Sequence, residues 1–191
     1  MKVISIIVML MSAVLLLSCW KTELVWYDFS DEKLMMSYEA PDRSLNLWSK
    51  KIRGFVNMNL FLTWTEVNNI YMQNNYIETI DISWLKKLWR IDLSNNLLYF
   101  WNDIKLPSDI RHINLSNNKL TSVDWLSGLK KLKTLDLSNN DLDDEDIKSL
   151  SWLNKLQYIN VKWNNVSQKI LDKFDTLNAK YLETHEMPYV K

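Results

Sequence analysis

A short run of carboxylates is the first feature of this chain whose residue types and spacing suggest chemistry. Five acids fall within six residues: Asp141, Asp143, Asp144, Glu145 and Asp146. Alternating acidic oxygens are typical of calcium loops, but such a loop needs Gly at its sixth position and Glu at its twelfth. Counted from Asp141, those positions hold Asp146 and Trp152. We therefore interpret the run as a solvated loop whose acids begin a helix, and we expect no metal.

Residues that could act as a base or a nucleophile are few and scattered. Of the two histidines, His112 has no obvious acid or nucleophile in its own repeat and is expected on the exposed face of a strand. Asp92 and Asp136 hold equivalent positions of a repeated pattern, with Asn114 between them, so they are not expected to form a carboxylate pair. No serine elbow, phosphate loop or histidine-based metal helix is present. The sequence thus predicts a protein that is not an enzyme and has no cofactor.

An eleven-residue frame recurs along the chain and must provide the elements that position these side chains. Three copies are clear and two are weaker, in order Val67–Ile77, Leu88–Leu98, Ile110–Leu120, Leu132–Leu142 and Leu156–Val166. The clearest reads LKTLDLSNNDL, which resembles the leucine-rich repeat, LxxLxLxxNxL. The frame asparagines are spaced by 21, 22, 22 and 24 residues, within the range of this repeat class.

The resemblance implies the fold class, an α/β solenoid. We expect a horseshoe arc with a concave parallel sheet of about six short strands, capped at both ends. Each repeat would begin with a strand such as residues 134–137, and the apolar residue at every third position between strands suits 3₁₀ turns. A single repeat could not bury its apolar side, so the core must form by stacking.

The asparagine of each frame is expected to be structural. In this family it resembles a ladder whose side chains bond the backbone of adjoining turns, since an amide both donates and accepts. The members of this ladder are Asn75, Asn96, Asn118, Asn140 and Asn164.

The outward strand positions are the candidate binding residues. In this family they line a concave surface on which partners usually dock, and interface hot spots are enriched in Tyr, Trp and Arg. The alternative is a merely solvated sheet. The candidates are Tyr71, Arg90, Asp92, His112, Asn114, Thr134, Asp136, Tyr158 and Asn160.

Both ends of the repeat array carry different sequence. Residues 41–166 are assigned to the repeats, beginning with a degenerate copy at Ser44. Residues 19–40 would form the N-terminal cap. Residues 167–191 would form a C-terminal cap helix starting at Ser167, followed by a frayed tail from Thr184.

The first residues resemble a bacterial lipoprotein signal. Lys2 precedes an apolar run, Val3–Leu17, and the string Leu16-Leu17-Ser18-Cys19 resembles the lipobox. Residues 1–18 would be the signal peptide and Cys19 the lipidated residue, so the protein would be held at the extracytoplasmic side of a membrane in the bacterial cell envelope. The alternatives are an uncleaved anchor, ordinary secretion or a cytoplasmic protein.

Tryptophan and glycine occur in unusual numbers. The chain has 10 Trp and 2 Gly, whereas average usage would give roughly 13 Gly. Trp84, Gly128 and Trp152 all lie twelve residues before a frame asparagine, and Trp163 holds a turn position where other repeats have Asn. Because one backbone geometry rarely suits both Gly and Trp, we hypothesise that UGA codons, read as Gly in the source, are written here as Trp. The alternative is a genuinely Trp-rich protein.

The formal net charge is zero, so nucleic acid is not an expected partner. The leading hypothesis is a membrane-anchored, monomeric, non-catalytic protein-binding module. The alternatives are an envelope scaffold without a dedicated partner and, if the N-terminus is not a signal, an intracellular regulator.

Overall fold

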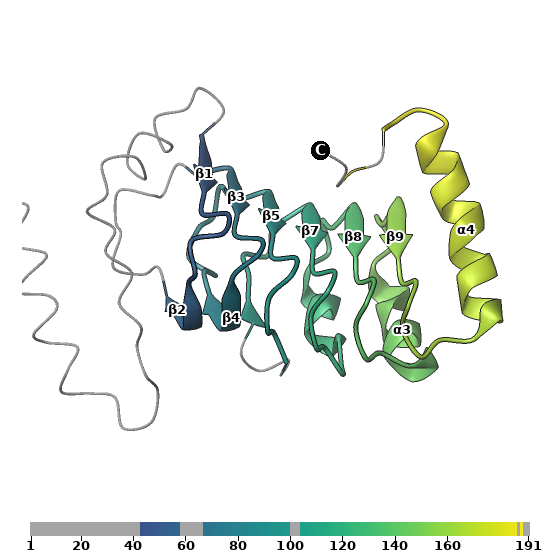
Figure 1. Ribbon diagram of the computed structural model, residues 1–191. Helices are drawn as coiled ribbons and strands as arrows, with labels where there is room; N and C mark the ends of the chain where they lie inside the picture. Colours follow the sequence, from purple (N-terminus) through teal and green to yellow (C-terminus); the bar gives the residue numbers. More distant parts are fainter. Residues whose placement is uncertain (1–42, 58–66, 100–103, 187, 189–191) are drawn as a thin grey trace, which may run out of the picture.

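The computed structural model describes residues 43–57, 67–99, 104–186 and 188 (Figure 1). The predicted signal peptide, Cys19 and the N-terminal cap through residue 40 lie outside these residues. Within the described part, the strands of the larger sheet follow one another in a row that ends at a long helix (Figure 1).

One parallel sheet of six strands runs through the described repeats. Its order is β1-β3-β5-β7-β8-β9, and each strand pairs in parallel with the next. This confirms the prediction of about six short parallel strands. The strands are β1 (Ser44–Asn46), β3 (Asn69–Tyr71), β5 (Arg90–Asp92), β7 (His112–Asn114), β8 (Thr134–Asp136) and β9 (Tyr158–Asn160).

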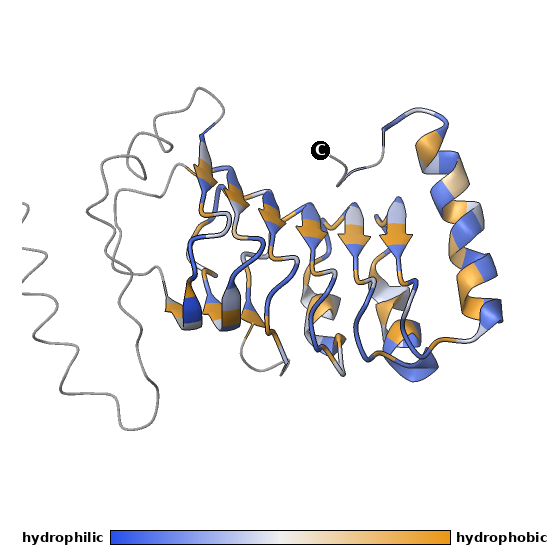
Figure 2. Ribbon diagram, viewed as in Figure 1, coloured by the Kyte–Doolittle hydropathy of each residue, from blue (hydrophilic) through white to orange (hydrophobic). Residues whose placement is uncertain are grey.

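Equivalent residues of neighbouring strands line up in columns across the sheet, because the strands pair in register. Arg90 is opposite His112, His112 opposite Thr134, and Thr134 opposite Tyr158. The middle residue of each strand points inward, and Ile91, Ile113 and Leu135 are fully buried. The apolar residues form bands that continue from strand to strand (Figure 2). Stacking therefore makes one continuous core, as the repeat pattern predicts.

A second sheet on the opposite side of the first repeats was not predicted. It has the order β2-β4-β6, from β2 (Arg53–Asn57), β4 (Tyr76–Asp81) and β6 (Ile104–Lys105). A bulge between Gly54 and Phe55 shifts the β2 register, and Gly54 has a φ of 66°, a conformation that glycine adopts without strain.

The later repeats carry short helical segments in place of these strands. They are η3 (Asp124–Gly128), α3 (Asp144–Ser149) and η4 (Leu150–Trp152), of which η3 and η4 are 3₁₀ helices. This agrees with the apolar residue at every third position, and it places the acidic run at a helix start.

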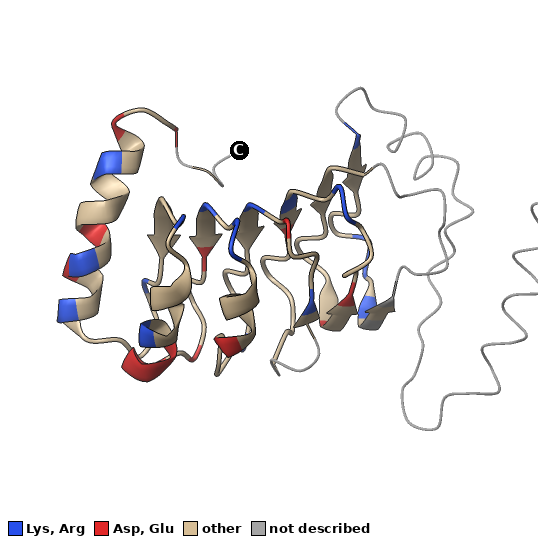
Figure 3. Ribbon diagram, turned by 180° about the vertical axis from the view of Figure 1, so that it is seen from behind, with Lys and Arg blue, Asp and Glu red and all other residues tan. Residues whose placement is uncertain are grey.

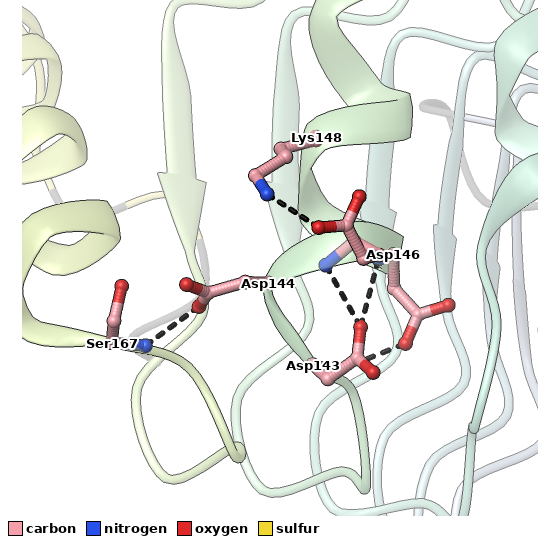
Figure 4. A network of polar contacts seen from close by, with 6 residues as sticks. Asp143, Asp144, Asp146, Lys148 and Ser167 are labelled. Carbon is pink, nitrogen blue, oxygen red and sulfur yellow. Dashed lines mark hydrogen bonds and ion pairs between the residues drawn. The ribbon is translucent and has the colours of Figure 1, made fainter.

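The acidic run caps α3 and joins it to the last helix (Figure 4). Asp143 Oδ1 accepts hydrogen bonds from the backbone N–H groups of Glu145 and Asp146. In turn, Asp146 Oδ2 accepts a hydrogen bond from the Asp143 N–H, which completes a capping box. Asp144 Oδ1 accepts from the Ser167 N–H at 2.7 Å, and this bond lowers the pKa of the Asp144 carboxyl. These carboxylates are thus used as helix caps, which is the role that the sequence predicts.

The long helix α4 (Gln168–Leu182) packs against β9 at the end of the sheet (Figure 1). Ile170 is buried, and Leu171, Phe174 and Leu177 pack against the core. Ser167 holds the N-cap position, but its side chain makes no capping bond. The helix start is instead held by the Asp144 bond to the Ser167 backbone.

The turns after the strands use left-handed backbone at one equivalent position. Asn74, Asn95, Asn117 and Asn139 have φ between 54° and 58°, and Trp163 has a φ of 58°. Asparagine tolerates this conformation, while tryptophan does not. Trp163 is also 71% exposed, so no packing offsets the strain.

The equivalent repeat position held by Trp84, Gly128 and Trp152 does not require left-handed backbone. Gly128 is not among the residues with positive φ, and a Cβ added there would meet nothing within 4 Å. Trp152 is exposed at the equivalent position. For Gly128 and Trp152 the expected steric conflict between Gly and Trp was therefore wrong, because the backbone at Gly128 is ordinary and both positions are open.

Candidate functional site

The frame asparagines lie inside the turns and bond three segments each. Asn140 Oδ1 accepts from the Leu120 N–H at 3.0 Å, and Asn140 Nδ2 donates to the carbonyls of Leu115 and Leu137 at 3.0 and 2.9 Å. Asn75, Asn96, Asn118 and Asn164 repeat this arrangement in their own repeats. The ladder joins neighbouring repeats and leaves these amides unavailable to a ligand.

The outward side chains of the six-stranded sheet form the sheet face, which is the candidate site. One column of it holds Asp92, Asn114, Asp136 and Asn160, and it is tied together by side-chain hydrogen bonds. Asn114 Nδ2 donates to Asp92 Oδ2 at 3.2 Å, and Asn160 Nδ2 donates to Asp136 Oδ2 at 3.1 Å. Carboxylates and amides alternate, so each carboxylate has a donor on the following strand.

Side chains of the same column also form the turns that follow the strands. Asp92 Oδ1 accepts from both the backbone N–H and the hydroxyl of Ser94, and Asp136 Oδ1 does so from Ser138. Such Asx turns are local and structural. Burial raises the pKa of the Asp136 carboxyl, while the Ser138 bonds oppose that shift. Much of this column is therefore used within the fold.

The neighbouring column is buried at β8 and β9. It consists of Arg90, His112, Thr134 and Tyr158. Thr134 is 0% exposed and Tyr158 is 4% exposed. Asn114 and Asp136 in the first column are buried as well. The expectation that Thr134 and Asp136 are open to a partner was wrong, because both are buried on the sheet face, where Thr134 bonds His112 and Asp136 bonds Asn160 of the neighbouring strands.

His112 is half-buried between its neighbours on the sheet face. Its Nδ1 shares a hydrogen bond of 2.8 Å with Thr134 Oγ1, and its ring meets the edge of the Trp89 ring at a centroid distance of 5.9 Å. Burial lowers the pKa of His112 to about 4, assisted by the positive charges of Arg90, Lys133 and Arg111. The imidazole is therefore neutral near pH 7, and it is less exposed than the sequence predicted.

The N-terminal part of the sheet face remains accessible. Tyr71, Arg90 and Asp92 come from the adjacent strands β3 and β5 and are half-buried, and Asn160 is half-buried at the other end. Two exposed aromatics were missed, Trp48 after β1 and Trp89 before β5. Extending the repeat frame to residues 44–48 would have placed Trp48 in a column with Gln73 and Ser94.

Other candidate sites in the described residues are weak. A depression of about 260 Å³ lies beside Trp89, Lys87 and Arg111, just below the size of ordinary ligand pockets. No group of three His, Cys, Asp or Glu side chains in the described part of the chain could hold a metal ion. Figure 3 shows both charge signs scattered over the surface, with acidic residues gathered at the start of α3.

These observations define the leucine-rich-repeat fold. A family model described as "Leucine Rich repeats (2 copies)" matches residues 109–148. An internalin (inlF) from Listeria monocytogenes has a similar structure, with 23% identity and a TM-score of 0.54 over 65% of this chain and 36% of that chain. The leucine-rich repeat domain of APL1B matches with 23% identity and a TM-score of 0.56, over 76% of this chain and 45% of that one.

The chain thus spans less than half the length of either of these structures. A search of curated proteins found no match. Among the described residues, none of the helices is both long and apolar enough to span a bilayer.

Proposed function

We propose that this chain is a non-catalytic protein-binding module that uses the accessible part of its sheet face. Leucine-rich-repeat domains are typically protein-binding modules, and the fold is usually non-catalytic. The observation that carries the proposal is the position of Tyr71, Arg90 and Asp92, which project from two adjacent strands held in register. Tyr and Arg are common anchors of protein interfaces.

The rigidity of the sheet supports this role. The asparagine ladder and the Asx turns fix the backbone of the turn that follows each strand, so the outward side chains are held in place before a partner arrives. Preorganisation of this kind lowers the entropy that binding must overcome.

Anchoring to a membrane through Cys19 is a second part of the proposal. It is supported by the sequence alone, through Lys2, the apolar run and the string Leu16-Leu17-Ser18-Cys19. Several acyl chains on Cys19 would hold the protein on the extracytoplasmic side of a bacterial envelope membrane, since stable anchoring needs more than one chain. A Cys19→Ser variant should lose fatty-acid labelling and leave the detergent phase; retention of both would contradict anchoring through Cys19.

An envelope scaffold without a partner is the second candidate. It is favoured by the internal use of Asn114, Thr134 and Asp136, which are buried on the sheet face. The two functions are separated by affinity capture with the Arg90→Glu, Tyr71→Ala chain against the unaltered chain. A binding module loses a specific partner, whereas a scaffold shows the same set of captured proteins.

A further inference from the structure

The C-terminal end of the chain turns back over the sheet face. After α4 ends, the chain reverses through a turn in which the N–H groups of Thr184 and His185 donate to the Tyr181 carbonyl at 3.2 and 3.1 Å. The described residues that follow, 183–186, turn from the end of α4 back toward the strands (Figure 1). Thr184 and His185, at the start of the tail predicted to be frayed, therefore contact the end of α4, whereas residues 187 and 189–191 of that tail lie outside the described residues.

One ring contact and one hydrogen bond connect this end of the chain to the sheet face, and a ring stack lies within it. The ring of Tyr181 lies against Tyr158 of β9, with centroids 5.6 Å apart, and the His185 ring stacks on Tyr181 at 4.4 Å. Further along, Arg90 Nη1 of β5 donates to the Pro188 carbonyl at 3.3 Å. We call the described residues after α4, 183–186 and 188, the strap; Tyr181 is the residue of α4 on which it rests.

The strap reaches across several strands. β7 and β8 lie between β5 and β9 in the sheet order, so the two contacts are separated by three strand spacings, or about 14 Å. The structure shows this reach directly, since the Tyr181 contact with Tyr158 of β9 and the Pro188 bond with Arg90 of β5 are both present. His112 and Thr134, on the strands in between, are less exposed than the repeat pattern predicts.

The strap is held by few contacts. Thr184, His185 and Glu186 are exposed, and the Arg90 bond is at the long end of the hydrogen-bond range. A short tether gives a segment an effective concentration in the millimolar range, so even weak contacts keep the strap in place. A protein with a larger interface could nevertheless displace it.

We propose that the strap is an intramolecular occupant of the sheet face, and that a protein partner reaches His112, Thr134 and Tyr158 only after displacing it. The inference rests on the proposed function in naming the sheet face as the docking site. Its mechanism is competition between a tethered segment of this chain and a partner in solution. Removing the strap should therefore open the sheet face without changing the repeats.

The position of the strap is tested by paramagnetic relaxation in the full chain held in detergent micelles. A nitroxide is attached at Glu186→Cys in a chain that also carries Cys19→Ser, so that the label reacts at one site. The amides of β5, β7 and β8 should broaden, and Arg90→Gln with Tyr181→Ala should reduce this broadening at least threefold. Arg111→Gln is the matched control, since it removes an exposed cation next to His112, and it should leave the broadening unchanged. Broadening limited to β9, or unaltered in the Arg90→Gln, Tyr181→Ala chain, would overturn the proposal.

Competition is tested with a synthetic peptide of residues 184–191 added to a chain that ends at Glu183 and retains α4. The peptide should give saturable shifts of the β5, β7 and β8 amides, and it should bind the full chain at least tenfold more weakly. Failure to bind the shortened chain, or equal binding to both, would contradict the proposal. Neither experiment uses a partner protein. A result that contradicts the strap proposal is therefore distinct from a result that contradicts the proposed function.

Discussion

The side-chain amide of Asn178 forms a pair of hydrogen bonds with the backbone of Ile159. Asn178 Oδ1 accepts from the Ile159 N–H at 2.9 Å, and Asn178 Nδ2 donates to the Ile159 carbonyl at 2.7 Å. β9 is the last strand of the sheet, so these groups would otherwise be unpaired at an open edge. The amide of α4 thus replaces the backbone of a further strand, which protects the edge against pairing with another chain.

We expect Asn178→Ala to lower the free energy of unfolding by about 2 kcal/mol, because two partly buried backbone groups lose their partners. Urea unfolding followed by circular dichroism measures this change. Thr176→Ala, at an exposed position of the same helix, is the matched control and should have little effect. Equal stability of the two variants would show that Asn178 does not protect the edge.

The asparagine ladder should be strongest where it is most buried. Asn140 is buried and Asn164 is half-buried, although both bond the same three kinds of backbone group. Asn140→Ala should cost about 3 kcal/mol, since buried donors and acceptors are left unsatisfied, while Asn164→Ala should cost about 1 kcal/mol. Chemical denaturation of both variants tests the order, and a larger loss for Asn164→Ala would contradict it.

The lowered pKa of His112 predicts a dependence of stability on pH. The unfolded chain binds a proton on His112 below pH 6.5, whereas the folded chain does so only near pH 4. More protons are therefore bound in the unfolded state across this window, and stability should fall as the pH decreases from 6.5 to 4. His112→Gln should flatten this part of the profile of unfolding free energy against pH; an unchanged slope would mean that other groups cause the loss.

The Trp163 backbone predicts that a smaller residue is better at this turn. Left-handed backbone costs roughly 1 to 2 kcal/mol for an ordinary side chain, so Trp163→Asn should raise the free energy of unfolding by about 1 kcal/mol. Trp152→Gly is the matched control, because the equivalent Gly128 has no positive φ, and it should give no such gain. A similar gain in both variants would point to exposed aromatic surface as the cause.

The same residue bears on the recoding hypothesis, which stays a hypothesis. Trp84 Nε1 and Trp125 Nε1 are buried without a hydrogen-bond partner in the described part of the chain, and Trp48, Trp89 and Trp152 are exposed. Neither environment favours tryptophan. Tandem mass spectrometry of the native protein should find glycine at Trp163; tryptophan at this position would end the idea.

The strands, the apolar core and the 3₁₀ turns could be predicted from the sequence because they depend on local spacing. Leu135 and Ile113 are buried by the repeat itself, wherever the rest of the chain lies. The burial of Thr134 could not be predicted in this way. Thr134 bonds His112 on the neighbouring strand, and the frame does not specify which side chains occupy these outward positions.

The candidate site was therefore predicted in part. The columns of the sheet face follow from the register, and the accessible Tyr71, Arg90 and Asp92 were among the predicted residues. The second sheet was missed because Ile77, Ile80 and Ile82 recur at spacings of three and two, which do not separate a strand from a turn. Trp48 was missed because the degenerate first repeat was left out of the columns.

Binding through the accessible part of the sheet face is tested most directly by site-specific photocrosslinking. A photoreactive amino acid replaces Tyr71 in the full chain, which is then crosslinked in its native envelope, with and without Arg90→Glu. The same label at Lys119, an exposed residue in the turn that follows β7, is the matched control. We predict one discrete crosslinked protein from position 71 that disappears with Arg90→Glu and is absent from position 119. The same products from both positions, unaffected by Arg90→Glu, would contradict a binding role for this face.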